Sequence, residues 1–194
     1  MEHKKKLKKC KVCQAEFSPR SSLDKVCGVT CAIKYAKDKE ATKQKQTDRI
    51  RKELLKSRGD WIREAQAAFN KFVRLRDAKE LCISCDKPPY FDRRYLVTIG
   101  GDWDCGHYRS VGSAPELRFC ELNAHKQCKK CNQFLSGNVV DYRKRLLDRI
   151  GSELVDWVEG QHEPAKLSIQ DIKDIKKKYS ALSRELEKAQ LEQT

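Results

Sequence analysis

Residues 81–85 read LCISC and residues 104–132 read DCGHYRSVGSAPELRFCELNAHKQCKKCN, and these two segments decide the fold. Each contains a Cys-x2-Cys turn, Cys82/Cys85 in the first and Cys128/Cys131 in the second. A tight turn of this kind aims two thiolates at one ion, and two such turns complete the tetrahedron of a structural zinc site. We therefore expect one zinc ion to hold both ends of the segment between them.

A second set of four cysteines, Cys10, Cys13, Cys27 and Cys31, has the spacing of treble-clef or ribbon zinc modules. The residues between these pairs include too few apolar side chains for a metal-free core, so zinc would supply the folding energy. The alternative is a disordered arm with free thiols. We expect no secretory signal and a cytoplasmic location, where closely spaced cysteines are more often metal ligands than disulfides.

The composition points to a polyanionic partner. The 194 residues carry a formal net charge of +14, with 36% charged and 39% hydrophobic residues, and no apolar run approaches a membrane span. The net charge is +10 over residues 1–60, +6 over 61–151 and −2 over 152–194. We therefore predict that nucleic acid contacts the first two parts. The alternative is a soluble basic protein whose charge does not serve to bind nucleic acid.

The predicted fold class is a small, zinc-stabilised α+β protein. We expect a zinc module at 1–36, a basic helical linker at 37–60, a core domain at 61–151 and a helical tail at 152–194. Apolar spacing predicts helices over 61–80 and 138–150, and β-favouring residues predict a strand over Tyr95–Ile99. Ser168 and Asp171 form a capping-box pattern before a heptad-like tail, which would pack back on the core or pair with a second copy.

Chemistry-bearing residues gather between the zinc-binding turns. Asp104 and His107 lie in the segment that the metal would hold, and Asn132 follows the last ligand directly, where a helix would start. We expect the zinc to bring His107 and Asn132 together. Cys105 and Cys120 fit neither zinc set and are expected to be small core residues, although a Cys105–His107 nucleophile is an alternative.

The order Gly-His followed by Asn-x4-Cys-x2-Cys-Asn resembles the HNH, or ββα-metal, nuclease pattern, with His107, Asn123 and Asn132 as its three letters. An asparagine in the third position, with two zinc-binding cysteine pairs, resembles the endonuclease VII type of phage junction resolvase. The run Trp103–Asn138 is more similar still to the phage lambda NinG (Rap) recombination endonuclease family, and this resemblance covers nearly the whole chain. It implies a bacteriophage endonuclease that cuts branched DNA, such as D-loops and Holliday junctions, in the bacterial host during recombination.

The resemblance implies a mechanism. As a neutral imidazole, His107 would take a proton from the water that attacks phosphorus. Asp104 and Asn132 would bind one Mg²⁺ or Mn²⁺, which would stabilise the charge that develops on the phosphate. Asn123 would orient the His107 loop. His125 is an alternative metal ligand, or a capping or packing residue.

One residue departs from the HNH pattern. Many HNH proteins place an Asp or His metal ligand directly before the catalytic histidine, where this chain has Gly106. Asp104 is the nearest carboxylate and our first choice of ligand. Candidate phosphate contacts are Arg109, Arg118 and Lys126, with ordinary solvated surface as the alternative for each.

Other functions are open at this point. The strongest rival is a non-catalytic zinc protein that binds DNA or RNA. A second rival is an HNH nuclease that acts in restriction or in intron homing. A third is a structural protein whose heptad tail is the functional part. Resolving a four-way junction needs two cuts, which favours a homodimer.

Overall fold

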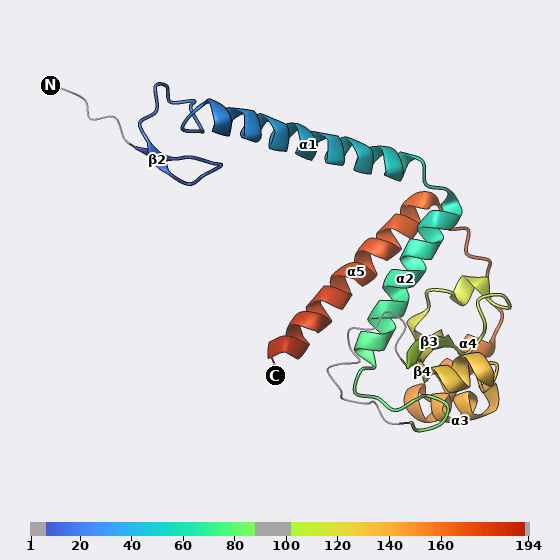
Figure 1. The fold of residues 1–194 in the computed structure, drawn as a ribbon. Helices are drawn as coiled ribbons and strands as arrows, with labels where there is room; N and C mark the ends of the chain where they lie inside the picture. Colours follow the sequence, from blue (N-terminus) through green and yellow to red (C-terminus); the bar gives the residue numbers. More distant parts are fainter. Residues whose placement is uncertain (1–6, 88–101, 193–194) are drawn as a thin grey trace. The chain divides into compact units, whose positions relative to one another are not determined.

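The computed structural model describes residues 7–87 and 102–192, and the chain divides into two compact units, Met1–Lys56 (unit 1) and Ser57–Thr194 (unit 2) (Figure 1). The strand predicted over Tyr95–Ile99 lies outside the described residues. Within the described ranges, no helix combines the length and the apolar character that a membrane crossing requires.

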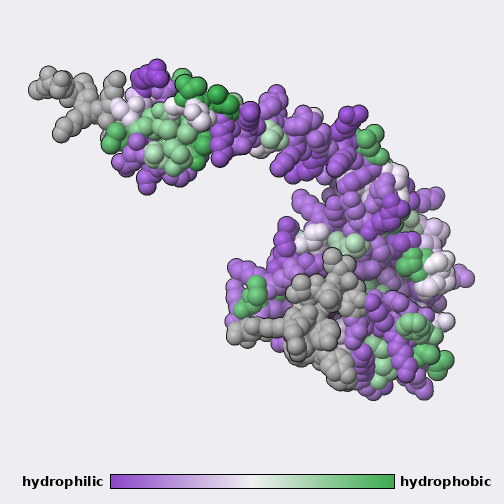
Figure 2. Space-filling model, in the orientation of Figure 1, coloured by the Kyte–Doolittle hydropathy of each residue, from purple (hydrophilic) through white to green (hydrophobic). Residues whose placement is uncertain are grey.

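Unit 1 is a small hairpin followed by a long helix. Strands β1 (Lys8–Lys9) and β2 (Glu16–Phe17) pair antiparallel around the first cysteine turn. Helix α1 (Val29–Leu54) begins two residues after Cys27 and carries Cys31 in its first turn, which is the treble-clef arrangement of a zinc module. No residue of α1 is buried, and Figure 2 shows a hydrophilic surface along it. The predicted boundary at 36/37 falls inside this helix.

Two long helices form one side of unit 2. Helix α2 (Arg58–Arg76) starts three residues before the predicted position, because Ser57 and Asp60 form a capping box. Helix α5 (Ile169–Glu192) starts at the predicted capping box, in which Asp171 accepts from the Ser168 N–H and Ser168 accepts from the Asp171 N–H. The heptad positions of α5, with Ile172 and Tyr179 buried, pack against α2 of the same chain.

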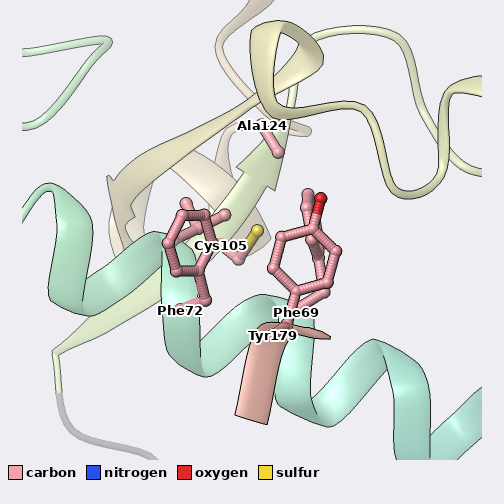
Figure 3. Close-up of a cluster of buried hydrophobic side chains, with 6 residues drawn as sticks. Phe69, Phe72, Cys105, Ala124 and Tyr179 are labelled. Carbon is pink, nitrogen blue, oxygen red and sulfur yellow. The ribbon is translucent and has the colours of Figure 1, made fainter. Parts of the chain in front are cut away.

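A two-stranded sheet lies next to α2. Strands β3 (Trp103–His107) and β4 (Ala124–Cys128) are antiparallel, with Asp104 opposite Gln127 and Gly106 opposite His125. Successive side chains of a strand point to opposite faces. Cys105 and Ala124 point to the face that packs on the aromatic side chains of α2 and α5, as Figure 3 shows. Asp104, Gly106, His125 and Gln127 belong to the other face.

Unit 2 also contains several short helices and helical turns. They are the 3-10 turns η2 (Pro115–Leu117) and η3 (Glu121–Asn123), the π-helical turn η4 (Lys130–Phe134), α3 (Val139–Ile150) and α4 (Ser152–Glu159). The helix predicted over 138–150 is confirmed. Tyr142 and Leu146 of α3 form a buried cluster with Ile83 and Val155. A mixture of helices and small sheets confirms the α+β class.

Candidate metal centre

The four cysteines of unit 2 converge. The sulfurs of Cys82, Cys85, Cys128 and Cys131 all lie within 4.8 Å of one another, and Cys85 Sγ is 3.7 Å from Cys128 Sγ. A disulfide would need about 2.0 Å, whereas a tetrahedron of thiolates around zinc has sulfurs about 3.8 Å apart, since each Zn–S bond is about 2.3 Å. The sulfur spacing therefore suits one zinc ion and no disulfide.

Hydrogen-bond donors surround these sulfurs. Cys82 Sγ accepts from the backbone N–H of Cys128 at 3.3 Å and of Ser84 at 3.5 Å. The side-chain amide of Asn138 donates to Cys131 Sγ at 3.8 Å. Such donors stabilise thiolates and orient metal ligands, so the surrounding residues also fit a metal site.

Unit 1 has a matching cluster. The sulfurs of Cys10, Cys13, Cys27 and Cys31 also lie within 4.8 Å of one another. Cys27 Sγ is 3.6 Å from both Cys13 Sγ and Cys31 Sγ. The backbone N–H of Cys13 is the largest influence that lowers the pKa of the Cys10 thiol, to about 6. Both predicted cysteine sets are therefore able to hold zinc.

Asp104 and Asn132 are in contact, although they are 28 residues apart in the chain. Asn132 Nδ2 donates to Asp104 Oδ2 at 3.0 Å, and Gln133 Nε2 donates to the same oxygen at 2.7 Å. The contact joins β3 to η4 next to Cys131 of the four-cysteine cluster. Carboxylate and amide oxygens are the donors that Mg²⁺ and Mn²⁺ prefer. Sequence reasoning missed Gln133, and its position directly after Asn132 was the available signal.

His107 lies on the opposite face of the hairpin from Asp104. Its ring packs against Phe69 of α2 with centroids 6.0 Å apart, and its Nε2 faces the carbonyl of Arg118 at 3.0 Å. The expectation that the zinc brings His107 to Asn132 is therefore wrong for this structure, because strand alternation turns the His107 and Asp104 side chains apart. Burial lowers the pKa of His107, and the backbone carbonyl of Arg118 opposes this shift.

Asn123 holds the segment that follows His107. Its Oδ1 accepts from the Arg109 N–H at 2.8 Å, and its Nδ2 donates to the Arg109 carbonyl at 3.0 Å. Its backbone carbonyl accepts from the Tyr108 N–H at 2.8 Å. Asn123 is fully buried, so this side chain sets the path of the chain beyond β3.

His125 is placed in the interior. Its Nδ1 lies 3.1 Å from the Tyr142 hydroxyl, which also donates to the Gly106 carbonyl at 3.1 Å. Burial lowers the pKa of His125 to about 3. Of the two roles left open for His125, this placement favours packing over metal binding.

The three predicted phosphate contacts are used inside the protein. Arg109 donates to the carbonyls of Val158 at 3.1 Å and Gly160 at 2.7 Å, where α4 ends and needs donors. Arg118 donates to Gln66 Oε1 at 3.3 Å. Lys126 is 2% exposed and donates to the Ala78 carbonyl at 2.9 Å. Each of these three residues therefore has a partner inside the protein; Arg109 and Arg118 remain partly exposed, whereas Lys126 is buried.

The structure also bears on the predictions made for two residues of β3, Cys105 and Gly106. Cys105 is buried among aromatic rings, and burial raises the pKa of its thiol to about 12, so the alternative of a Cys105 nucleophile has no support. Gly106 has no space for a side chain: an added Cβ would lie 2.9 Å from both Cβ and Cδ of Gln127. Gln127 therefore occupies the space that a metal ligand at position 106 would need.

Comparison with known proteins assigns the family. The family model described as "Bacteriophage Lambda NinG protein" matches residues 2–190. The chain belongs to the NinG family. The ninG protein of Escherichia phage 933W is 38% identical over 203 residues, covering 95% of this chain and 96% of the relative. The ninG protein of Escherichia phage lambda is 36% identical, covering 93% of this chain and 92% of its own length. The ninG protein of Salmonella phage P22 is 35% identical, covering 90% of each chain. No solved structure matches.

Proposed function

We propose that this NinG-family chain is a metal-dependent endonuclease that hydrolyses phosphodiester bonds of branched DNA, in phage recombination in the cytoplasm of the host. The pair formed by Asp104 and Asn132 supports this most. It joins β3 to η4 at 3.0 Å, beside the cysteine cluster, and it would offer two side-chain oxygens to one cation once the Asn132 amide has turned over. The HNH pattern in the sequence has its third letter at this asparagine.

A divalent cation held there would supply charge stabilisation for the phosphate and the leaving oxygen. Asp104 would bind it through a carboxylate oxygen, while Gln133 keeps that carboxylate oriented. Asn132 now presents its Nδ2 to Asp104. Its amide must turn over so that Oδ1 becomes the ligand, since only the oxygen of an amide can coordinate.

His107 is the proposed base. A base must be neutral, and in the present position burial lowers the pKa of His107 and so favours the neutral imidazole. If Nε2–H donates to the Arg118 carbonyl, Nδ1 keeps the lone pair that accepts a proton. The proposal requires the imidazole to leave Phe69 and turn toward the Asp104 side of the hairpin when DNA binds.

The positive charge supports a DNA substrate. The net charge of +16 over residues 1–151 gives a strong attraction for phosphates. The charge does not select branched over linear DNA, so the branched substrate rests on the family resemblance. A homodimer remains part of the proposal because two cuts are needed.

A non-catalytic nucleic-acid-binding protein is the second candidate, and one observation favours it. The His107 ring packs on Phe69 and contacts a backbone carbonyl, as a structural histidine would. In that case both cysteine clusters only stabilise the fold.

Cleavage of a DNA panel separates the two candidates. Linear, forked, D-loop and four-way DNAs are incubated with the zinc-loaded protein, with Mg²⁺ or Mn²⁺ and without either. His107→Ala and Asp104→Ala should each lower the cleavage rate about 10²- to 10⁴-fold while leaving binding intact. Asp102→Ala is the control, because its side chain is 65% exposed and its ion pair with Lys87 lies at the surface.

Binding without cleavage of any DNA by the wild-type protein would establish the second candidate. Normal cleavage by His107→Ala would remove His107 as the base. Cleavage of linear duplex at one sequence would point to a restriction or homing nuclease.

A further inference from the structure

An exposed apolar patch follows the proposed metal site directly. Phe134 is 79% exposed, Leu135 48%, Val139 46% and Val140 71%. Single exposed apolar residues are ordinary on protein surfaces, but four large ones within seven consecutive positions are a local concentration of the kind found at binding surfaces. We name these four side chains the 134–140 patch.

The backbone of this patch is held by the zinc-binding turn. Ser136, Gly137 and Asn138 are consecutive residues with φ of 50°, 86° and 43°, a left-handed region that costs energy for the two that are not glycine. The Gly137 N–H donates to the Cys131 carbonyl at 2.9 Å, and Gln127 Nε2 donates to the Gly137 carbonyl at 2.6 Å.

Asn138 completes this attachment, because its amide reaches both Cys131 Sγ and, at 3.3 Å, the carbonyl of Ser84. The turn is therefore bonded to both halves of the zinc site. Phe134 and Leu135 before the turn, and Val139 and Val140 after it, are held in place and cannot easily fold inward to bury themselves.

Positive charge flanks the patch. Lys129 and Lys130 precede it, and Lys144, with a side chain 72% exposed and paired with Asp141 at 3.6 Å, lies one turn after Val140 on α3. A ligand that matches this surface is a polyanion that also presents a flat apolar face. Branched DNA has both features, since its phosphates are anionic and the base pairs that border a branch point lack one stacking neighbour. Linear duplex hides its base faces except at its ends.

We propose that the 134–140 patch is a wedge that packs against the unstacked base pair at a DNA branch point, with Phe134 stacking on the base. This inference rests on the proposed function, and it names how the same site would select branched DNA. Proteins that unstack DNA insert phenylalanine, leucine and other apolar side chains in this way. The patch would then place the branch point beside Asp104 and Asn132.

The test compares Phe134→Ala with wild type as full-length, zinc-loaded protein. Binding is measured without Mg²⁺ or Mn²⁺ to a four-way junction, a fork and a linear duplex of equal length. The two branched probes carry 2-aminopurine at the branch. Phe134→Ala should weaken binding to the branched probes about 5- to 100-fold, as the loss of one base–aromatic stack does, and leave linear duplex unchanged. The change in 2-aminopurine fluorescence on binding should disappear.

Two variants serve as controls. Leu191→Ala removes another exposed apolar side chain of unit 2, 77% exposed on α5, and should change no affinity. Phe134→Trp keeps an aromatic face and should keep the preference for branched DNA. Zinc content measured for each variant shows that the fold is retained.

Equal affinities of Phe134→Ala and wild type for the branched probes would overturn the wedge. The wedge would also be overturned if Phe134→Ala changed the subunit number measured by sedimentation while its affinity for the junction stayed the same, because the patch would then be an interface between copies of the chain. Preferential, Phe134-dependent binding by a protein that never cleaves DNA would retain the wedge and refute the nuclease. Normal branched-DNA cleavage by Phe134→Ala would refute the wedge alone.

Discussion

Replacing Gly106 by alanine should strongly destabilise unit 2, although the change adds only one methyl group. Gly106 lies in β3 opposite His125, with Gln127 on the same face of the hairpin. The new Cβ would come within 2.9 Å of Gln127 Cβ and Cδ and closer still to its Oε1. Gln127 is fully buried, so its side chain has no open space into which it could move.

The size of the effect follows from what Gln127 would lose. Its Nε2 donates to Ser84 Oγ at 2.7 Å and to the Gly137 carbonyl at 2.6 Å, and moving the amide breaks both bonds. A buried polar group left without its partner costs about 1–3 kcal/mol, and overpacking a core adds about 1–3 kcal/mol. The two contributions together predict a loss of about 2–6 kcal/mol, a large part of the roughly 5–15 kcal/mol that stabilises a typical domain.

Urea denaturation of the zinc-loaded protein, followed by circular dichroism, measures this loss. Gly59→Ala is the matched control, because the nearest atom to its new Cβ would be Ser57 Oγ at 3.7 Å, and it should change the free energy of unfolding by less than about 1 kcal/mol. Adding Gln127→Ala to Gly106→Ala removes the clash with Gln127 Cδ and Oε1 and leaves only the close approach to Cβ, so the double variant should lose less than the sum of the two single losses. A Gly106→Ala protein within about 0.5 kcal/mol of wild type would refute the packing argument.

Three further predictions follow from the buried residues and the cysteine clusters. Cys128→Ser should release one of two zinc ions and unfold unit 2, since a structural zinc contributes roughly 10–16 kcal/mol. Cys13→Ser should release the other zinc ion and leave the melting temperature of unit 2 unchanged. Metal analysis and thermal melting check both outcomes. His125 has a pKa of about 3 in the folded protein and about 6.5 in the unfolded chain. Its contribution to stability is therefore complete above about pH 6.5. Below that, the free energy of unfolding falls by up to about 1.4 kcal/mol per pH unit as the pH drops toward 3. His125→Gln should flatten that part of a urea-stability profile, and an unchanged slope would contradict the assignment. Ile172→Ala should cost about 2–5 kcal/mol in the same urea assay, because Ile172 is fully buried in a cluster with Trp61; a change only in subunit number would show that α5 pairs between chains.

Local patterns in the sequence were enough to predict the metal sites and most helices. Thiol pairs separated by two or three residues must lie in turns or at a helix start, so the spacing alone grouped the eight cysteines into two sets of four. The α3 helix and the capping box at Ser168 were predictable for the same reason, because each depends on residues three or four apart. The start of α2 was missed, although the Ser57–Asp60 pair was present in the sequence.

The tertiary structure decided which side chains meet. Asp104 and His107 lie three residues apart, yet strand alternation sends one to η4 and the other to Phe69. Arg109 and Lys126 are charged residues of a basic protein, but carbonyls from distant segments draw them into internal hydrogen bonds. Composition cannot reveal such carbonyls, because they face those side chains only after the chain has folded.

The packing partner of the heptad tail, helix α5, was also set by tertiary structure. Its periodicity determined that one face of α5 is apolar and must be buried, but the same face could have packed on its own domain or on a second copy. In this structure the partner is α2 of the same chain. The two four-cysteine groups, the helices and the apolar faces could be predicted from local patterns, since these depend on near neighbours. The partners of those faces and the placement of His107 could not, because both depend on segments that folding brings together.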